Sequence, residues 1–257
     1  MIPKKSLGQN FLINEKIADD IIKASNLTTD DTVLEIGPGT GILTERLVKA
    51  AGQVLAVEKD FDLVTKLLNR YKSTKNIKII HQDALWFDLF SLSKYKVVAN
   101  IPYNITSPLI RKFIENEPRP ELLILMVQKE VAERICAKPG DSSRGLLTII
   151  VEFYAEAEIL FQVNKKEFYP VPQVDSAVIK ITPKKQLLNI EPALFFKMVK
   201  AGFSSKRQQI HNSLAGTLRL TKDEVLDLLK KAQIAPTLRA EDLSLEDWER
   251  LTKVYQH

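Results

Sequence analysis

Asn100 and Tyr103 stand together in "NIPYNITSPL" (100–109), directly after the apolar run "YKVVA". Pro102 lacks a backbone donor and biases the residue before it toward extended geometry, so the chain should leave a strand here. An amide and an aromatic ring at a strand end can accept hydrogen bonds from a ligand and stack on it. Open α/β sheets bind ligands at this edge, although the same residues also suit an ordinary strand-to-helix turn.

A glycine-rich turn forms a second candidate site in "EIGPGTG", which follows the apolar run "TVLEI". Gly37, Gly39 and Gly41 let the backbone turn tightly and approach a ligand closely. The helix pattern that follows would offer unpaired backbone donors at its start. Glu58 ends the next strand pattern, 21 residues after Gly37, and an acid at this place hydrogen-bonds ribose hydroxyls in dinucleotide folds. The set indicates an adenosine-containing cofactor.

The glycine spacing narrows the choice of cofactor. It is G-x-G-x-G and not the G-x-G-x-x-G of the nicotinamide fingerprint, so it suits a cofactor without phosphates. Asp83, in "HQDAL", ends the third strand pattern, where its carboxylate could accept from an adenine amino group. The glycine turn, Glu58 and Asp83 in this order resemble the S-adenosylmethionine site of class I methyltransferases.

With this cofactor, "NIPY" resembles the motif of methyltransferases that modify exocyclic amines of bases. An adenine amine is a poor nucleophile because its lone pair is delocalised into the ring. The side-chain oxygen of Asn100 and a neighbouring main-chain carbonyl would hold both N–H bonds and aim the lone pair at the methyl group. Positive charge develops on the nitrogen during transfer, so these acceptors would bind the transition state most tightly. Tyr103 would stack on the base.

Alternating strand and helix patterns should position these residues. Helical spacing in "TGILTERLVKA" and "FDLVTKLLNRY" separates the first three strands, which is the rhythm of a parallel sheet covered on both faces. Two later runs, "AEILFQV" and "DSAVIKI", lack room for a crossover helix between them and should pair antiparallel. The expected strands are "TVLEI" (32–36), "QVLAVE" (53–58), "NIKII" (76–80), "YKVVA" (95–99) and "ELLILMV" (121–127).

The pattern changes after "TPKK", and we place a domain boundary near Lys184, giving a catalytic domain at 1–183 and a helical domain at 184–257. The expected helices there are "EPALFFKMVKAGF", "SSKRQQIHNSLAG", "KDEVLDLLKKA" and "SLEDWERLTKVY". Residues 192–222 hold six basic side chains and no acid. Such a block suits a polyanionic partner, and it equally suits a solvated helix face.

Composition restricts the class of protein. The chain has 257 residues, of which 45% are hydrophobic and 27% are charged, with a net charge of +5. One cysteine excludes an internal disulfide, and three widely spaced histidines make a zinc site improbable, so we expect no metal. The chain shows neither a signal peptide nor a membrane span, and we expect a cytoplasmic location.

Seven motifs occur in the order found in the ribosomal RNA adenine dimethyltransferases, which this chain resembles over nearly its whole length. They are "SLGQNFL" (6–12), "EIGPGTG", "VEKD" (57–60), "QDAL" (82–85), "NIPYNI" (100–105), "FYPVPQVDSAV" (168–178) and "FSSKRQQIHNSL" (203–214). The resemblance implies an α/β class I (Rossmann-like) sheet of seven strands, one of them antiparallel, followed by a small all-helical RNA-recognition domain. It also implies dimethylation of two adjacent adenosines near the 3′ end of small-subunit rRNA, late in subunit assembly.

The resemblance also assigns residues to the cofactor. Asn10 and Leu12 match the residues that close over its methionine end. Gly37 and Gly39 match the glycine loop, and Glu58 matches the ribose ligand. The remaining cofactor contacts that it implies are Asp83, Ala84 and Asn100.

For the substrate, the resemblance implies that Asn100 and Tyr103 clamp the target amine and that Phe168 flanks the base from its other side. Lys206 and Arg207, at the start of a helix, are expected to bind rRNA phosphates. Lys4 and Lys5, beside the cofactor lid, are expected to touch RNA as well. We expect a monomer, as is usual in the family.

Two alternatives share part of this pattern. Antibiotic-resistance relatives carry the same cofactor motif and the same type of "NIPY" motif but modify one adenine of large-subunit rRNA, whereas "PQVDSAV" and "FSSKRQQIHNSL" favour the small-subunit enzymes. A non-catalytic ribosome-assembly factor could also keep the fold. The intact glycine loop, Glu58, Asn100 and Tyr103 argue against lost catalysis.

Overall fold

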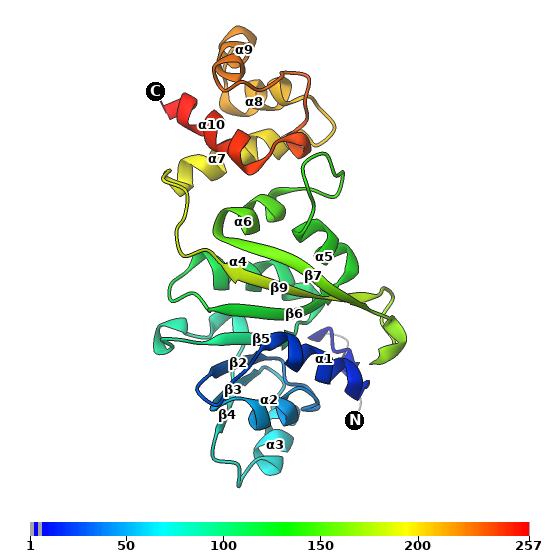
Figure 1. Ribbon diagram of the computed structural model, residues 1–257. Helices are drawn as coiled ribbons and strands as arrows, with labels where there is room; N and C mark the ends of the chain where they lie inside the picture. The colour runs from blue at the N-terminus through cyan, green and yellow to red at the C-terminus, as the bar shows by residue number, and fades with distance from the viewer. Residues whose placement is uncertain (1–2, 5–6, 257) are drawn as a thin grey trace. The chain divides into compact units, whose positions relative to one another are not determined.

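The computed structural model, which describes residues 3–4 and 7–256, contains a seven-stranded sheet with one antiparallel strand (Figure 1). Only β9 runs against its neighbours, so the expected topology and the antiparallel pairing of the two late strands are confirmed. In spatial order the strands are β4 (Ile77–His81), β3 (Gln53–Glu58), β2 (Thr32–Ile36), β5 (Lys96–Asn100), β6 (Leu122–Gln128), β9 (Ser176–Pro183) and β7 (Ala155–Val163).

The chain divides into two compact units. The first comprises residues 1–132 and 155–183, and the second comprises residues 133–154 and 184–257. The chain passes from the first unit to the second at Lys184, which is where the change in sequence pattern predicted a domain boundary. The second unit also contains residues 133–154, which the expected division placed in the catalytic domain. The apolar helix of this segment packs with the carboxyl-terminal helices, and no shift in amino-acid composition marks the segment.

The first unit buries its apolar side chains between the sheet and its helices. Ala18 and Ile21 of α1 and Leu47 of α2 pack in one cluster with inward-facing residues of six strands of the sheet. Such apolar faces, repeated at helical spacing against a sheet, drive this packing. The α-helices of this unit are α1 (Glu15–Ser25), α2 (Thr44–Ala50), α3 (Phe61–Arg70) and α4 (Thr106–Glu115), and α5 (Lys129–Ile135) begins in it and ends in the second unit.

A two-stranded ladder lies apart from the main sheet. β1 (Phe11–Leu12) pairs antiparallel with β8 (Phe168–Tyr169), which places Leu12 opposite Phe168. The backbone N–H of Ile13 donates to the carbonyl of Glu167 at 2.9 Å and extends this pairing. The amino-terminal segment is therefore tied to the loop before β9.

The second unit is helical, with α6 (Leu146–Tyr154), α7 (Pro192–Gly202), α8 (Ile210–Leu218), α9 (Lys222–Lys231) and α10 (Leu245–Gln256). Thr221 and Glu224 form the expected capping box at the start of α9. The buried guanidinium of Arg144 binds both carboxylate oxygens of Glu152, each at 2.6 Å, and the carbonyls of Ala137 and Leu243. Arg144 thus joins 137–152 to the loop before α10.

The expected helix over "SSKRQQIHNSLAG" is shorter than its pattern. Residues 203–205 form a 3₁₀ turn, and α8 begins only at Ile210, whose N–H donates to the carbonyl of Leu238. Lys206 and Arg207 are exposed in the intervening turn and not at a helix start. This tertiary contact decides where α8 begins.

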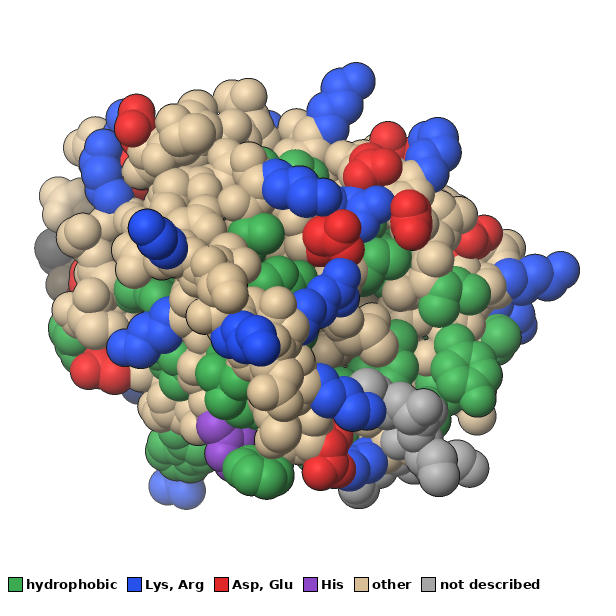
Figure 2. Space-filling view, turned by 90° about the horizontal axis from the view of Figure 1, so that it is seen from below, with side chains coloured by type: hydrophobic (Ala, Val, Ile, Leu, Met, Phe, Trp, Pro, Cys, Tyr) green, Lys and Arg blue, Asp and Glu red, His purple; other side chains and the backbone are tan. Residues whose placement is uncertain are grey.

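No helix of the part of the chain that the structure describes is both long and apolar enough for a bilayer crossing. The face shown in Figure 2 carries lysine and arginine side chains over much of its area, with acidic side chains among them. Its charge is therefore mixed and does not form a single basic stripe.

Candidate active site

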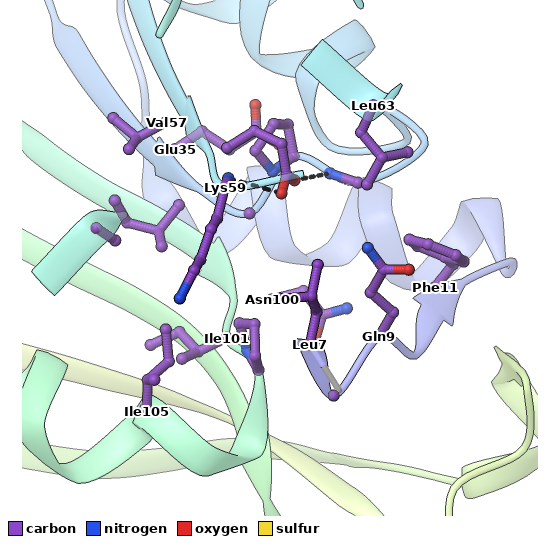
Figure 3. A pocket seen from close by; sticks show the side chains of 18 of the residues that line it. Leu7, Gln9, Phe11, Glu35, Val57, Lys59, Leu63, Asn100, Ile101 and Ile105 are labelled. Atoms are coloured by element: carbon purple, nitrogen blue, oxygen red, sulfur yellow. Dashed lines mark hydrogen bonds between the residues drawn. The ribbon is translucent and has the colours of Figure 1, made fainter. Parts of the chain in front are cut away.

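A pocket opens at the carboxyl ends of β2, β3, β4 and β5, lined by nearly all the residues that the motifs predict (Figure 3). Parallel strands bring their ends to one edge, which gathers motifs that are far apart in the sequence. The pocket wall includes the following predicted residues: Asn10, Leu12, Gly37, Gly39, Glu58, Asp83, Ala84, Asn100 and Tyr103.

The glycine turn follows β2 and adopts left-handed backbone geometry. Gly37, Gly39 and Gly41 have φ of 63°, 59° and 88°, a region that side chains with a Cβ rarely occupy. At Gly39 space is also limited, since an added Cβ would lie 3.1 Å from the ring of Phe11. The close approach of Phe11 therefore depends on glycine at position 39.

Glu58 ends β3 and is 7% exposed. Its Oε1 accepts the backbone N–H groups of Lys59 and Asp60, each at 2.8 Å, and its Oε2 accepts that of Gly39 at 3.3 Å. Burial raises the pKa of this carboxyl, and the three N–H donors oppose the rise. The carboxylate is thus fixed between its own strand end and the glycine turn.

Asp83 follows β4 and caps the short 3₁₀ helix Ala84–Trp86. Its Oδ1 accepts the N–H of Leu85 at 2.9 Å, and its Oδ2 pairs with Nζ of Lys59 at 2.9 Å. The lysine lowers the pKa of Asp83, so the carboxylate stays charged. Lys112 of α4 supports this turn from below by donating to three backbone carbonyls, those of Ala84, Leu85 and Phe87.

Asn100 is the last residue of β5 and is half-buried. Its Nδ2 donates to the carbonyl of Asn10 at 3.2 Å. Because this bond engages the amide nitrogen, the amide oxygen is turned to the other side and remains as an acceptor. This is the atom that the proposed chemistry requires.

Tyr103 follows Asn100 in a 3₁₀ turn, and its hydroxyl is hydrogen-bonded to Oγ of Ser176 at 2.9 Å. Ser176 is fully buried at the start of β9. Burial raises the pKa of the Tyr103 hydroxyl, so the ring stays neutral. Ser176, within the quoted motif "PQVDSAV", thus fixes the ring, a role that no separate feature of the sequence indicates.

The structure does not bring Phe168 to the pocket wall. Its side chain is 1% exposed and packs in the core with Leu12 and Val178. In this arrangement the ring supports the segment that carries Leu12 and does not line the pocket. The neighbouring Tyr169 and Val171 are exposed.

The basic residues that were predicted to contact RNA lie in different surroundings. Lys4 pairs with two carboxylates, those of Asp60 at 2.6 Å and Asp62 at 2.7 Å, while its side chain remains 43% exposed. Lys5 lies outside the described residues. In the second unit, Nζ of Lys206 donates to the carbonyl of Ser142 at 2.7 Å, and Arg207 is exposed.

One pocket residue was missed although its motif was quoted. Glu35 is 1% exposed in β2, and neither of its carboxyl oxygens has a hydrogen-bond partner among the described residues. Burial raises its pKa to about 8, and nearby Glu58 adds to the rise. An acid inside the apolar run "TVLEI" was the signal that could have identified it.

These residues fit an adenosyl cofactor with an amino-acid end. The carboxylates of Glu58 and Asp83 can accept from hydroxyl and amino groups, and the unpartnered Glu35 can accept from a further N–H donor. The glycine turn leaves room beside them. The class I sheet that carries the pocket agrees with the expected fold.

Comparison with known proteins identifies the family. The model of the family described as "Ribosomal RNA adenine dimethylase" matches residues 3–257. A "Ribosomal RNA small subunit methyltransferase A" of Dehalococcoides mccartyi is 46% identical, with 98% of this chain and 88% of the relative covered.

Two solved structures share the fold. One is a dimethyladenosine transferase from Plasmodium falciparum, with 30% identity, a TM-score of 0.82, and 94% and 95% of the two chains covered. The other is the 23S rRNA methyltransferase ErmE, with 29% identity, a TM-score of 0.77, and 96% and 100% covered. The chain therefore belongs to the ribosomal RNA adenine dimethylase family and is an S-adenosylmethionine-dependent rRNA adenine dimethyltransferase.

Proposed function

We propose that this protein dimethylates the N6 amines of two adjacent adenosines in a hairpin loop near the 3′ end of small-subunit rRNA, late in subunit assembly. The observation that carries the proposal is the Asn100 amide at the pocket edge, with its nitrogen engaged by Asn10 and its oxygen left as an acceptor. Glu58 and Asp83 line the same pocket.

S-adenosylmethionine, when bound, supplies the activated methyl group. Glu58 would hold its ribose, Asp83 and Ala84 its adenine, and Gly37, Gly39, Asn10 and Leu12 the remainder. Their places on the pocket wall support these assignments.

On the substrate side, the Asn100 oxygen accepts one N–H of the target amine, and a main-chain carbonyl of the same segment accepts the other. The lone pair is then directed toward the methyl group. As the nitrogen becomes positive, both acceptors stabilise it more strongly than in the ground state. Tyr103, fixed by Ser176, stacks on the base. The methylated amine is acidic while cationic and loses its proton without a strong base.

The substrate is assigned to the small subunit because the relatives that act there are more similar to this chain. The Dehalococcoides mccartyi protein is 46% identical, whereas the 23S enzyme is 29% identical. A single-adenine activity on large-subunit rRNA is the alternative. The complete pocket argues against a purely non-catalytic assembly factor, although assembly can depend on the protein as well.

We infer that the substrate is a small-subunit precursor particle, that Lys206 and Arg207 contact its phosphates, and that the enzyme acts as a monomer. The exposure of both side chains supports the phosphate contacts. Because ribosomal subunits are its partners, we place the protein in the cytoplasm.

Labelled methyl transfer tests the function directly. Small-subunit particles from cells lacking the endogenous enzyme are incubated with the protein and labelled S-adenosylmethionine, and the modified nucleosides are identified. We expect N6,N6-dimethyladenosine at two adjacent positions. Modification of large-subunit rRNA instead would establish the alternative, and cofactor binding without transfer to any rRNA would indicate the assembly factor.

A further inference from the structure

Residues 7–12, here called the strap, cross the pocket and contact the catalytic motif. The carbonyl of Asn10 accepts Nδ2 of Asn100 at 3.2 Å. Gly8 lies against the same motif, because a Cβ added there would be 3.3 Å from Oδ1 of Asn104. The position of the strap therefore sets which way the Asn100 amide points.

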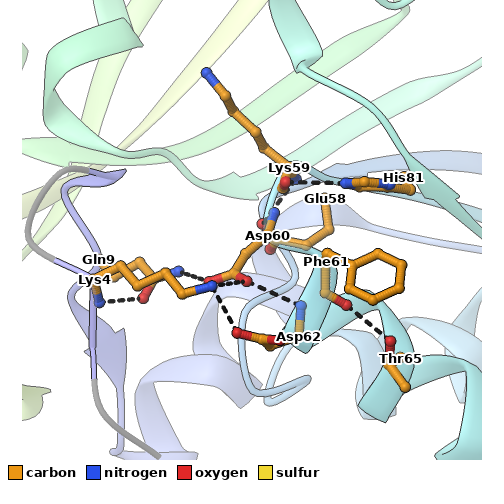
Figure 4. A network of polar contacts seen from close by, with 9 residues as sticks. All are labelled: Lys4, Gln9, Glu58, Lys59, Asp60, Phe61, Asp62, Thr65 and His81. Carbon is orange, nitrogen blue, oxygen red and sulfur yellow. Dashed lines mark hydrogen bonds and ion pairs between the residues drawn. The ribbon is translucent and has the colours of Figure 1, made fainter.

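Asp60 holds the strap through its hydrogen bond with Gln9, as Figure 4 shows. The Asp60 side chain is 3% exposed, and its Oδ2 accepts Nε2 of Gln9 at 2.8 Å. Its Oδ1 accepts Nζ of Lys4 at 2.6 Å and the N–H of Asp62 at 3.0 Å. The backbone N–H of Lys4 in turn donates to Oε1 of Gln9 at 2.7 Å. One buried carboxylate thus anchors the strap and caps α3.

Asp60 is also bonded to the proposed ribose ligand. Its backbone N–H donates to Oε1 of Glu58 at 2.8 Å. A continuous path of contacts therefore runs from Glu58 through Asp60 to Gln9. The next residue of the strap, Asn10, continues the path, because its backbone carbonyl accepts the side-chain amide of Asn100. Asp60 therefore supports both the proposed ribose ligand, Glu58, and the strap that orients the Asn100 amide.

We propose that Gln9 and Asp60 are positioning residues that hold the strap so that the Asn10 carbonyl keeps the Asn100 amide in its productive orientation. The inference rests on the proposed function. An asparagine amide has nearly the same shape when its nitrogen and oxygen exchange places. With the Asn10 carbonyl in place, the exchanged form sets two oxygens against each other. Without it, the amide turns freely and presents its N–H groups to an amine that needs an acceptor.

An exchange of partners tests this role. Gln9→Glu sets a carboxylate against Asp60 and should lower the single-turnover rate of methyl transfer about tenfold at saturating cofactor and RNA. The double variant Gln9→Glu/Asp60→Asn restores an amide–carboxylate bond with the donor on the other side. Asn at position 60 keeps an acceptor for the Asp62 N–H and for Lys4. We expect its rate to return to within threefold of the parent, a recovery that general damage to the fold would not produce.

Asp62→Asn is the matched control. Asp62 shares Lys4 with Asp60 but, among the described residues, makes no hydrogen bond to Gln9, and it is exposed, so the rate of this variant should stay within twofold of the parent. Gln9→Met removes the bond without adding charge and should slow transfer while the melting temperature is unchanged.

A normal rate in folded Gln9→Met or Gln9→Glu would overturn the proposal. A folded double variant that is no faster than Gln9→Glu would overturn it too. If the double variant did not fold, the rate of Gln9→Met would decide. An inactive parent protein would reject the proposed function and this inference with it, whereas an active parent with unaffected variants rejects the inference alone.

Discussion

The side chain of Asn100 has two polar atoms that the fold treats differently. The nitrogen is bound to the Asn10 carbonyl, and the oxygen is left for a ligand. Sequence could identify Asn100 from its place before Pro102. Only the structure assigns a partner to each atom, because that partner is 90 residues away in the chain.

Replacing Asn100 by alanine should therefore affect turnover more than cofactor affinity. Loss of an acceptor for the developing charge should raise the barrier by about 2–4 kcal/mol, since such groups act mainly on the transition state. Methyl transfer and calorimetric titration of S-adenosylmethionine measure the two effects. Asn116→Ala, which removes an exposed amide bonded to the carbonyl of Lys112 in α4, is the control. A rate within twofold of the parent would contradict the assigned role.

Glu58→Ala should instead weaken cofactor binding more than RNA binding. Hydroxyls left without a charged acceptor should cost about 1.5–3 kcal/mol. The substitution also frees three backbone N–H groups, so Glu58→Gln, whose amide oxygen keeps an acceptor for those of Lys59 and Asp60, should have a smaller effect. Calorimetry of the cofactor is the measurement, with the exposed Glu156→Ala as control. An unchanged dissociation constant would mean that Glu58 only caps its strand.

At the scale of elements, short connections place the chemistry and regular elements support it. The pocket residues lie at strand ends, while β1 and β8 pair only two residues each yet fix the segment over the pocket. Sequence patterns located the strands well because alternation with helices repeats along the chain. They did not reveal the pairing of Phe11–Leu12 with Phe168–Tyr169, because contacts so distant in the chain leave no local periodicity.

The turn between residues 203–205 and α8 gives a prediction about RNA. Replacing both Lys206 and Arg207 by alanine should weaken binding to small-subunit particles. It should also reduce the slope of log affinity against log salt by roughly 0.7 for each lost phosphate contact, if these behave as contacts to single strands. Cofactor affinity should not change, because the cofactor pocket is lined by residues of the first unit.

Lys230→Ala/Lys231→Ala, on exposed positions of α9, is the control pair from the same unit. It removes the same charge from a different place and should leave the affinity closer to that of the parent. Equal losses of affinity for small-subunit particles in both double variants would show a general effect of charge. No change in either affinity or slope for Lys206 and Arg207 would show that RNA is held elsewhere.

At the scale of the whole molecule, the buried Glu35 links stability to pH. Its pKa is raised to about 8 in the folded state, so between about pH 5 and pH 8 the folded protein binds a proton that the unfolded chain has lost. Stability then falls as pH rises through this range, because the unfolded state binds fewer protons. The stability that the protonated Glu35 carboxyl contributes should be fully present only near and below the ordinary carboxyl pKa, and it should be absent above pH 8.

Glu35→Gln keeps the shape and removes the titration. We expect the free energy of unfolding of the parent to drop by about 2 kcal/mol more than that of the variant between pH 6 and pH 8. Denaturant unfolding at both pH values measures the difference, and other titrating groups cancel in the comparison. Parallel pH dependences of the two proteins would show that Glu35 is charged in the folded state.

The sequence by itself determined the sheet, its one antiparallel strand, the family, and the residues at the strand ends. The positions of the strands along the chain and the pocket residues at their ends follow from local patterns, because each strand carries its own apolar run and each motif lies at its end. Tertiary structure alone decided that Phe168 is in the core, that Lys4 is paired with Asp60 and Asp62, and that residues 133–154 belong with the second unit. These outcomes depend on burial and on partners far away in the chain, and neither property is encoded in spacing.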